Sequence, residues 1–219
     1  MPLPVSLPET EREKMATRSS SGGDYELSDP VGGFADVVRR VVLQPQAFFA
    51  GLPRQGSLVG PLVFALICTE ISVLLVGLLT FLDVPGGATT LVGLGGDQGF
   101  LTFLGGLLVA PIAAAVGVLL TALVTHLLVA VVIGSGNSGF GATFRVVAYS
   151  SVTSLAGWLP FIGWLFSLYR LYLATVGIRE MHATTMGKAL LVVLLPAILV
   201  LLLVLVVVGA SALVYFRAA

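Results

Sequence analysis

The sequence predicts an all-α membrane protein, a polytopic bundle of about five transmembrane helices with a cytoplasmic N-terminus. Two of the supporting observations are compositional. Hydrophobic residues make up 57% of the chain and charged residues only 10%, and the mean hydropathy is +1.05, which is far from a soluble domain. The third observation is that several uncharged apolar runs reach or exceed the roughly 20 residues needed to cross a bilayer.

The first 56 residues divide into two segments of different composition. Residues 1–30 are rich in Pro, Ser, Gly and mixed charges, which predicts a disordered cytoplasmic tail. Residues 31–56 carry apolar residues at helical spacing, with Asp36 and the arginines that follow it off that face. This pattern predicts an amphipathic segment lying in the membrane interface. It fits equally well a short helix over residues 31–52 that packs under the bundle.

The remaining apolar runs predict a membrane domain over residues 57–217. They cover about residues 58–82, 101–133, 142–158, 161–179 and 189–216. The second run is long for a single crossing, and its Gly and Pro residues would allow it to kink. Pro160 separates the third run from the fourth. Because proline removes a helix donor and disfavours helix in the residue before it, we expect these two runs to form a helical hairpin.

Basic residues predict the orientation of the spans. They gather before the first span, after the second and after the hairpin, at Arg39, Arg40, Arg54, Arg145, Arg179 and Lys188. The loops 83–100 and 159–163 contain no Lys or Arg. Lys and Arg are enriched in cytoplasmic loops. Five spans, with the N-terminus inside and the C-terminus outside, therefore place all these bases in the cytoplasm.

Ionisable residues inside the spans are candidates for function because they are expensive to leave unpaired in lipid. Counted from the cytoplasmic ends of the spans, Glu70, His126, Tyr149 and Arg170 all lie about 10–18 Å deep. We therefore expect them to form one intramembrane polar cluster, with an ion pair between Glu70 and Arg170. The cluster could serve as a structural bridge between spans or as a path for transport or proton relay, and the pattern leaves both roles open.

Patterns that would indicate an enzyme are missing. Residues 134–139 match G-x-G-x-x-G, but no strand precedes them and no acid follows about 20 residues later, as dinucleotide binding requires. Cys68 is the one cysteine and sits in an apolar run, and His126 and His182 lack metal-ligand spacing. We expect no catalytic residue, cofactor or metal, and hence no enzyme. The net charge is zero, so no nucleic-acid partner is expected.

Several short motifs occur in a characteristic order. They are Pro45 with Phe48-Phe49, Pro61-Leu62-Val63-Phe64-Ala65, His126 before the Gly-rich loop, Phe144-Arg145-Val146, Ala148-Tyr149-Ser150, Leu159-Pro160-Phe161-Ile162-Gly163, Gly177-Ile178-Arg179-Glu180-Met181-His182 and Lys188-Ala189. In this order the chain resembles the YIP (Ypt/Rab-interacting protein) family membrane domain, in its prokaryotic form, over about residues 42–200. The resemblance implies a five-span fold with a cytoplasmic N-terminus, which agrees with the orientation predicted from the basic residues.

The chain departs from the family pattern in its N-terminal tail. Eukaryotic members carry an acidic-Leu-x-Gly-Pro motif associated with Rab GTPase binding, and here only Asp29-Pro30 is similar to it. A Rab-type GTPase is therefore not expected as a partner, and the Val/Ala/Gly-rich composition predicts a bacterial plasma membrane. One predicted function is a non-enzymatic scaffold in the lipid bilayer that organises lipids or recruits partners, as a homo-oligomer or with other membrane proteins. The alternative is a small transporter or channel that uses Glu70, His126 and Arg170.

Overall fold

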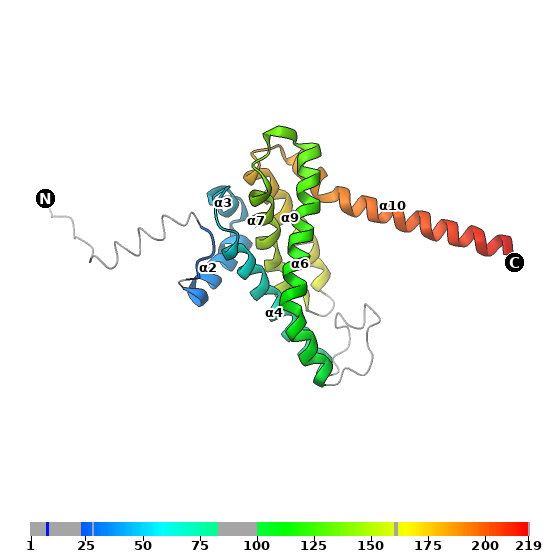
Figure 1. The fold of residues 1–219 in the computed structure, drawn as a ribbon, viewed down its shortest axis with the longest axis horizontal. Coiled ribbons are helices and arrows are strands. Elements are labelled where there is room, and N and C mark those ends of the chain that lie inside the picture. Colours follow the sequence, from blue (N-terminus) through cyan, green and yellow to red (C-terminus); the bar gives the residue numbers. More distant parts are fainter. Residues whose placement is uncertain (1–7, 9–22, 28, 83–99, 160–161, 219) are drawn as a thin grey trace.

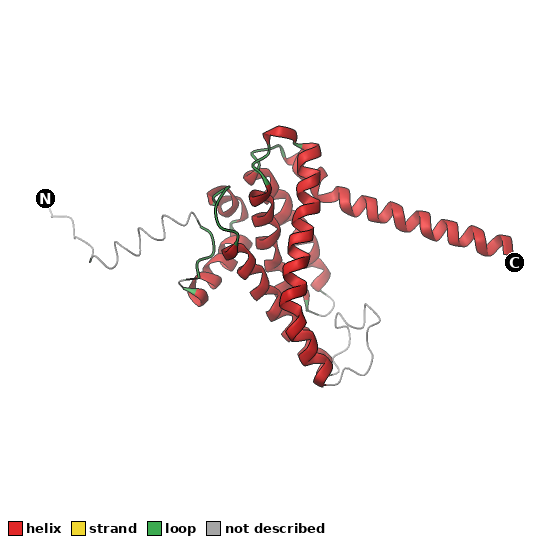
Figure 2. Cartoon of the chain, in the orientation of Figure 1, coloured by secondary structure: helices red, strands yellow, loops and turns green. Residues whose placement is uncertain are grey.

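The computed structural model describes residue 8 and residues 23–27, 29–82, 100–159 and 162–218, and every element in these ranges is a helix (Figures 1 and 2). The elements are α2 (Pro30–Leu43), α3 (Pro45–Gly51), α4 (Val59–Phe81), α6 (Phe100–Val132), η1 (Gly134–Gly136), α7 (Phe140–Ser150), η2 (Ser151–Thr153), α8 (Ser154–Gly157), α9 (Gly163–Met181) and α10 (Met186–Ala218). The predicted all-α class is confirmed. Residues 83–99 of the predicted loop and most of the predicted tail lie outside the described residues.

Two helices, α2 and α3, occupy the segment where the sequence predicted one. Asp29 caps α2, since its Oδ1 accepts the N–H of Gly32 at 3.1 Å, and Pro30 takes the first helical position. The helix ends before Gln44, which has φ −138°. Pro45 accounts for this break, because the residue before a proline avoids the helical conformation. The same proline then begins α3.

Three of the described helices are long and apolar enough to cross a membrane. The crossing segments are Val59–Thr80 in α4, Phe103–Val132 in α6 and Met186–Val206 in α10. The run predicted at residues 101–133 is one continuous helix, although Pro111 lies inside it. Figure 1 shows α10 leaving the bundle and extending away from the other helices. The predicted number of five spans also needs the hairpin arms, so it stays a prediction.

The hairpin has one arm made of α7, η2 and α8, and a second arm made of α9. The predicted turn at Pro160 lies outside the described residues, but glycine contacts show how the arms run. A Cβ on Gly163 would lie 2.3 Å from the carbonyl oxygen of Gly157, and one on Gly177 would lie 2.7 Å from Val146 Cγ1. The arms are therefore antiparallel and in contact at both ends. Small residues allow this close approach of helices.

The core of the protein is centred on α7. All side chains from Ala142 to Thr153 are buried, because α7 lies between α4, α6 and α9. The outer surface of α6 is the opposite case, with Leu108 77% exposed and Val131 80% exposed. A long row of exposed apolar side chains is costly in water and normal in contact with lipid.

Candidate functional site

Arg145 on α7 has a completely buried side chain. Its Nε donates to Asp24 Oδ2 at 3.2 Å, Nη2 donates to the carbonyl oxygen of Ser57 at 2.8 Å, and Nη1 donates to that of Gly141 at 3.4 Å. A buried guanidinium is tolerated only when it is both paired with an opposite charge and hydrogen-bonded. Arg145 meets both conditions, and Asp24, which supplies the charge, lies 121 residues earlier in the chain.

Tyr149 follows Arg145 by one helical turn and contacts the same N-terminal segment. Its hydroxyl donates to Asp24 Oδ1 at 2.9 Å and accepts the backbone N–H of Tyr25 at 2.8 Å. Both oxygens of the Asp24 carboxylate are therefore engaged, one by Arg145 and the other by Tyr149. We name the group Asp24, Arg145 and Tyr149 the N-terminal anchor.

The anchor holds the segment 23–27 tightly against the beginning of α4. The Tyr25 side chain is only 3% exposed, and its ring centroid lies 6.1 Å from that of Phe64. A Cβ on Gly60 would lie 2.4 Å from the carbonyl oxygen of Tyr25, so glycine is required there for the backbone approach. These residues belong to the part of the chain predicted as a disordered tail, and the structure differs there because the segment buries an aromatic ring and an ion pair.

Burial raises the pKa of the Asp24 carboxyl, while the Arg145 charge and the hydrogen bonds from Tyr149 and Arg145 lower it. The net direction is upward, so the cost of removing the carboxylate from water exceeds the stabilisation by its partners. The hydrogen bonds of Tyr149 and the packing of the buried Tyr25 ring therefore hold the anchor together as much as charge attraction does.

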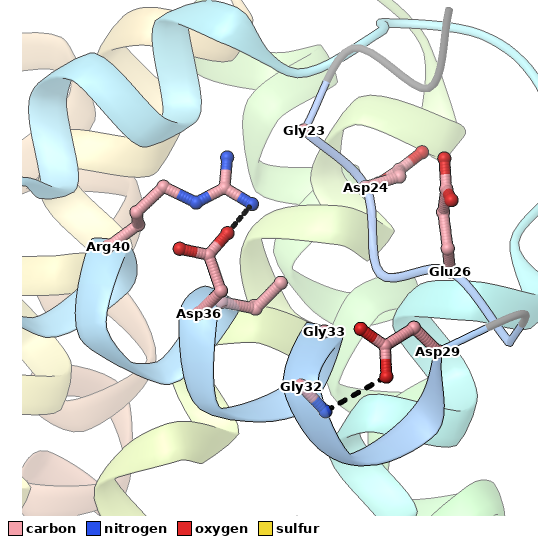
Figure 3. Close-up of a pocket in the computed structure, with 9 residues that line it drawn as sticks. Gly23, Asp24, Glu26, Asp29, Gly32, Gly33, Asp36 and Arg40 are labelled. Atoms are coloured by element: carbon pink, nitrogen blue, oxygen red, sulfur yellow. Dashed lines mark hydrogen bonds and ion pairs between the residues drawn. The ribbon is translucent and has the colours of Figure 1, made fainter. Parts of the chain in front are cut away.

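Two open hollows flank the anchored segment. One has a volume of about 390 Å³ and lies between the segment and α2 (Figure 3). Its charged lining residues are Asp24, Glu26, Asp29, Asp36 and Arg40. Asp36 pairs with Arg40 at 2.8 Å, and Asp29 caps α2, so these two carboxylates serve the local helix. The other hollow, of about 540 Å³, lies on the α4 side of the segment.

The four residues of the predicted polar cluster do not form one hydrogen-bonded group. Tyr149 belongs to the anchor, and His126 bonds Thr143. Glu70 has a buried Oε1 without a hydrogen-bond partner, and Arg170 is exposed on α9. Among the described residues no ion pair joins Glu70 to Arg170. Similar depth on separate helices does not make two side chains face each other, which is why the expected pair does not form in the structure.

His126 instead takes part in a directed chain of hydrogen bonds. The backbone N–H of Ser138 donates to His182 Nδ1 at 3.0 Å, so that nitrogen carries no proton and His182 is neutral. Its Nε2 lies 3.1 Å from Thr143 Oγ1, which lies 3.0 Å from His126 Nδ1. Burial, together with the nearby His126 and Arg54, lowers the pKa of His182 to about 4. The chain fixes the glycine-rich loop 134–139 onto the end of α9.

The described residues offer little for catalysis. They contain no group of three or more His, Cys, Asp or Glu side chains placed to hold a metal ion. Cys68 is buried on α4, where no substrate from solution reaches it. The polar groups of the N-terminal anchor and of the histidine chain hold described segments to one another. The histidine chain ends on the backbone N–H of Ser138.

Fold and site together define an integral membrane protein with an all-helical bundle and an anchored N-terminal segment. The Yip1 domain matches residues 39–208, and the chain belongs to the Yip1 domain family. The predicted YIP resemblance is thereby confirmed. Comparisons with curated proteins and with solved structures give no match.

The sequence pattern predicts Arg145 in a cytoplasmic loop and Asp24 in a tail, so it does not identify these two members of the anchor. A signal for one of them was present. Arg145 and Tyr149 are four residues apart, which puts them on the same face of a helix, and both belong to motifs of the family resemblance. Asp24 had no comparable signal, because nothing local indicates which acid of the tail reaches α7.

Proposed function

We propose that this protein is a non-enzymatic, multi-pass scaffold of the Yip1 family that organises the membrane or recruits partners to it. The observation that carries the proposal is the N-terminal anchor. It holds the segment 23–27, and through it α2, in a defined position on the bundle instead of leaving it as a free tail. A bundle that orders such a segment at its surface is suited to presenting it to lipids or to other membrane proteins.

The proposal includes five spans with the N-terminus in the cytoplasm, in a bacterial plasma membrane. Its support is the distribution of basic residues and the antiparallel hairpin of α7 and α9. Cysteine introduced by Asp97→Cys should be labelled by an impermeant maleimide from outside intact cells, and cysteine introduced by Lys188→Cys should not. The buried Cys68 is replaced by alanine in both variants. Labelling of both positions from the same side would contradict the five-span orientation.

Partner recruitment is tested by crosslinking in native membranes. A photoreactive side chain at the exposed Arg39 of α2 should capture a defined membrane protein or a second copy of the chain. The same position in a Tyr149→Phe variant should capture less, because the anchor that orients the segment is weakened. If neither variant gives a specific product, the scaffold proposal fails in its recruiting form.

One observation favours the alternative of a small transporter or channel. Glu70 keeps a buried oxygen without a hydrogen-bond partner, and such intramembrane acids are common in transport paths. Solute or proton flux through reconstituted vesicles that disappears in Glu70→Gln and Arg170→Gln would favour this alternative over the scaffold. Flux equal to that of protein-free vesicles would remove it.

A further inference from the structure

Helix α2 has three distinct sides. Val37 and Val41 are 1% and 0% exposed and pack on the bundle. A second apolar stripe, made of Val31, Ala35 and Val42, recurs at helical spacing and is exposed, with Val31 at 81%. The third side carries Asp36, Arg39, Arg40 and the exposed Leu43. A helix that packed on the bundle with one side and faced water with the others would not need a second apolar stripe.

The position of α2 along α4 places this stripe below the membrane surface, at the level where acyl chains begin. The ring centroids of Phe34 and Phe64 are 5.2 Å apart. Phe64 lies five residues after Val59, where the membrane-crossing segment of α4 begins, which is about 8 Å at 1.5 Å per residue. Helices that lie in a membrane interface bury their apolar face by about 5–10 Å. At Phe34, α2 therefore lies within this range.

The exposed stripe is also continuous with the apolar surface of α9. The hydroxyl of Tyr169 on α9 donates to the carbonyl oxygen of Val42 at 2.6 Å. Beside Tyr169 on the same helix, Leu165 is 46% exposed and Tyr172 is 42% exposed. The stripe of α2 and this side of α9 therefore meet the same surroundings, and for the bundle those surroundings are acyl chains.

We propose that α2 is inserted in a single leaflet, the one at the N-terminal end of α4, with its stripe among the acyl chains and its charged side at the headgroups. The inference rests on the proposed membrane scaffold and deepens it. A helix of 14 residues is about 21 Å long, and its volume adds area to that leaflet alone. The protein is thus a wedge that prefers membrane curved convexly on the side of its N-terminal segment.

The wedge is rigid because α2 is fixed in three ways. Val37 and Val41 pack against the bundle, Asp29 caps its first turn, and the N-terminal anchor holds the segment that leads into it. A helix free to tilt out of the leaflet would relax instead of responding to curvature. The anchor therefore links the order of the segment to the shape of the molecule.

Insertion is tested first, by spin-label accessibility in lipid vesicles. Nitroxides are attached to Val31→Cys, Val42→Cys and Leu43→Cys in a Cys68→Ala background. Leu43 is the matched control, since it is exposed but lies on the charged side. We expect labels at positions 31 and 42 to be accessible to oxygen and protected from a water-soluble nickel chelate, with the reverse at position 43. A label at position 31 that is accessible to the chelate would overturn the insertion.

Curvature preference is tested with narrow tubes pulled outward from giant vesicles that contain the labelled full chain. Molecules with the N-terminal segment on the outer leaflet should be enriched in the tube relative to the flat membrane, and inverted molecules should be depleted. The ratio should fall to one in a Val31→Ser, Val42→Ser double variant and stay at its native value in Leu43→Ser. All substituted side chains are exposed, so folding is not at risk.

These experiments distinguish insertion of α2, curvature preference and partner recruitment from one another. Labels in the acyl region together with equal partition of both orientations would overturn the wedge. Failure of the crosslinking experiment above with normal sorting into tubes would contradict partner recruitment and leave the wedge standing.

Discussion

The two arginines of the hairpin illustrate how differently a charge can be accommodated. Arg145 on α7 is completely buried and has an ion pair and two carbonyl acceptors. Arg170 on α9 is exposed and makes no ion pair with any described residue. Two of the three acceptors of Arg145 come from a remote acid and from a residue that precedes α4. A buried charge is thus stabilised by segments that meet in the tertiary structure, and depth along a helix does not predict which segments those are.

The largest expected effect is that of removing the buried guanidinium. Arg145→Met leaves the Asp24 carboxylate partly buried and unpaired, and breaking a buried ion pair costs about 3–5 kcal/mol. We expect a loss of about 3 kcal/mol in unfolding free energy, near the lower limit of that range, since Asp24 keeps 16% exposure. Chemical unfolding in detergent measures it. Arg170→Met is the comparison, and an equal loss there would contradict the distinction between the two sites.

Gly60→Ala should have the next largest effect, because its Cβ would lie 2.4 Å from the carbonyl oxygen of Tyr25. Overpacking of this kind costs about 1–3 kcal/mol, and the destabilisation should be localised to the anchored segment 23–27. Hydrogen exchange of the Tyr25 amide should increase with it. Gly117→Ala is the control, since nothing lies within 4 Å of its Cβ. Unchanged exchange in Gly60→Ala would mean that the segment does not pack as described.

The histidine chain predicts a dependence of stability on pH. The pKa of His182 is lowered from 6.5 to about 4, so between these values the unfolded chain binds the proton and the folded one does not. Stability should fall as pH drops from 7 to 5, by about 1–2 kcal/mol. Unfolding curves at several pH values measure this slope. In His182→Asn, whose side-chain oxygen can still accept the Ser138 N–H, the slope should be smaller, and an unchanged slope would assign it to other groups.

Tyr149→Phe removes one hydroxyl from the anchor and leaves the Arg145–Asp24 pair in place. The hydroxyl makes two hydrogen bonds, and we expect a loss of about 1–2 kcal/mol from the unsatisfied Tyr25 amide and the weakened carboxylate. The change should leave the ring packing against Phe64 and Phe48 intact. Loss of stability as large as that of Arg145→Met would show that the ring position, not the hydroxyl, supports the anchor.

The smallest effect is expected at the residues that the sequence predicted to pair. Without an ion pair between them, the effects of Glu70→Gln and Arg170→Gln on the unfolding free energy should add to within about 0.5 kcal/mol, so their coupling is the smallest effect expected. The double swap Glu70→Arg with Arg170→Glu should show no recovery relative to the single changes. Coupling between the two positions in unfolding experiments would bring back the predicted bridge.

Helix positions could be predicted because the information is local. The runs predicted at residues 58–82 and 101–133 are α4 and α6, with boundaries that differ by at most one residue, since hydrocarbon thickness sets the length of an apolar run. Pro45 is likewise a local signal for the helix break at Gln44. The pattern leaves open whether residues 31–52 meet lipid or the bundle, and in the structure α2 has one buried and one exposed apolar stripe.

Family, helical class and membrane residence follow from composition, run length and short motifs, all of which depend on neighbouring residues. The anchor does not, because Asp24 and Arg145 are brought together only when the N-terminal segment folds back onto α7. Ring burial, carbonyl positions and glycine contacts decide that meeting, and each is a property of segments distant in the chain. For the same reason the sequence could identify Glu70 and Arg170 as unusual but could not establish whether they face each other.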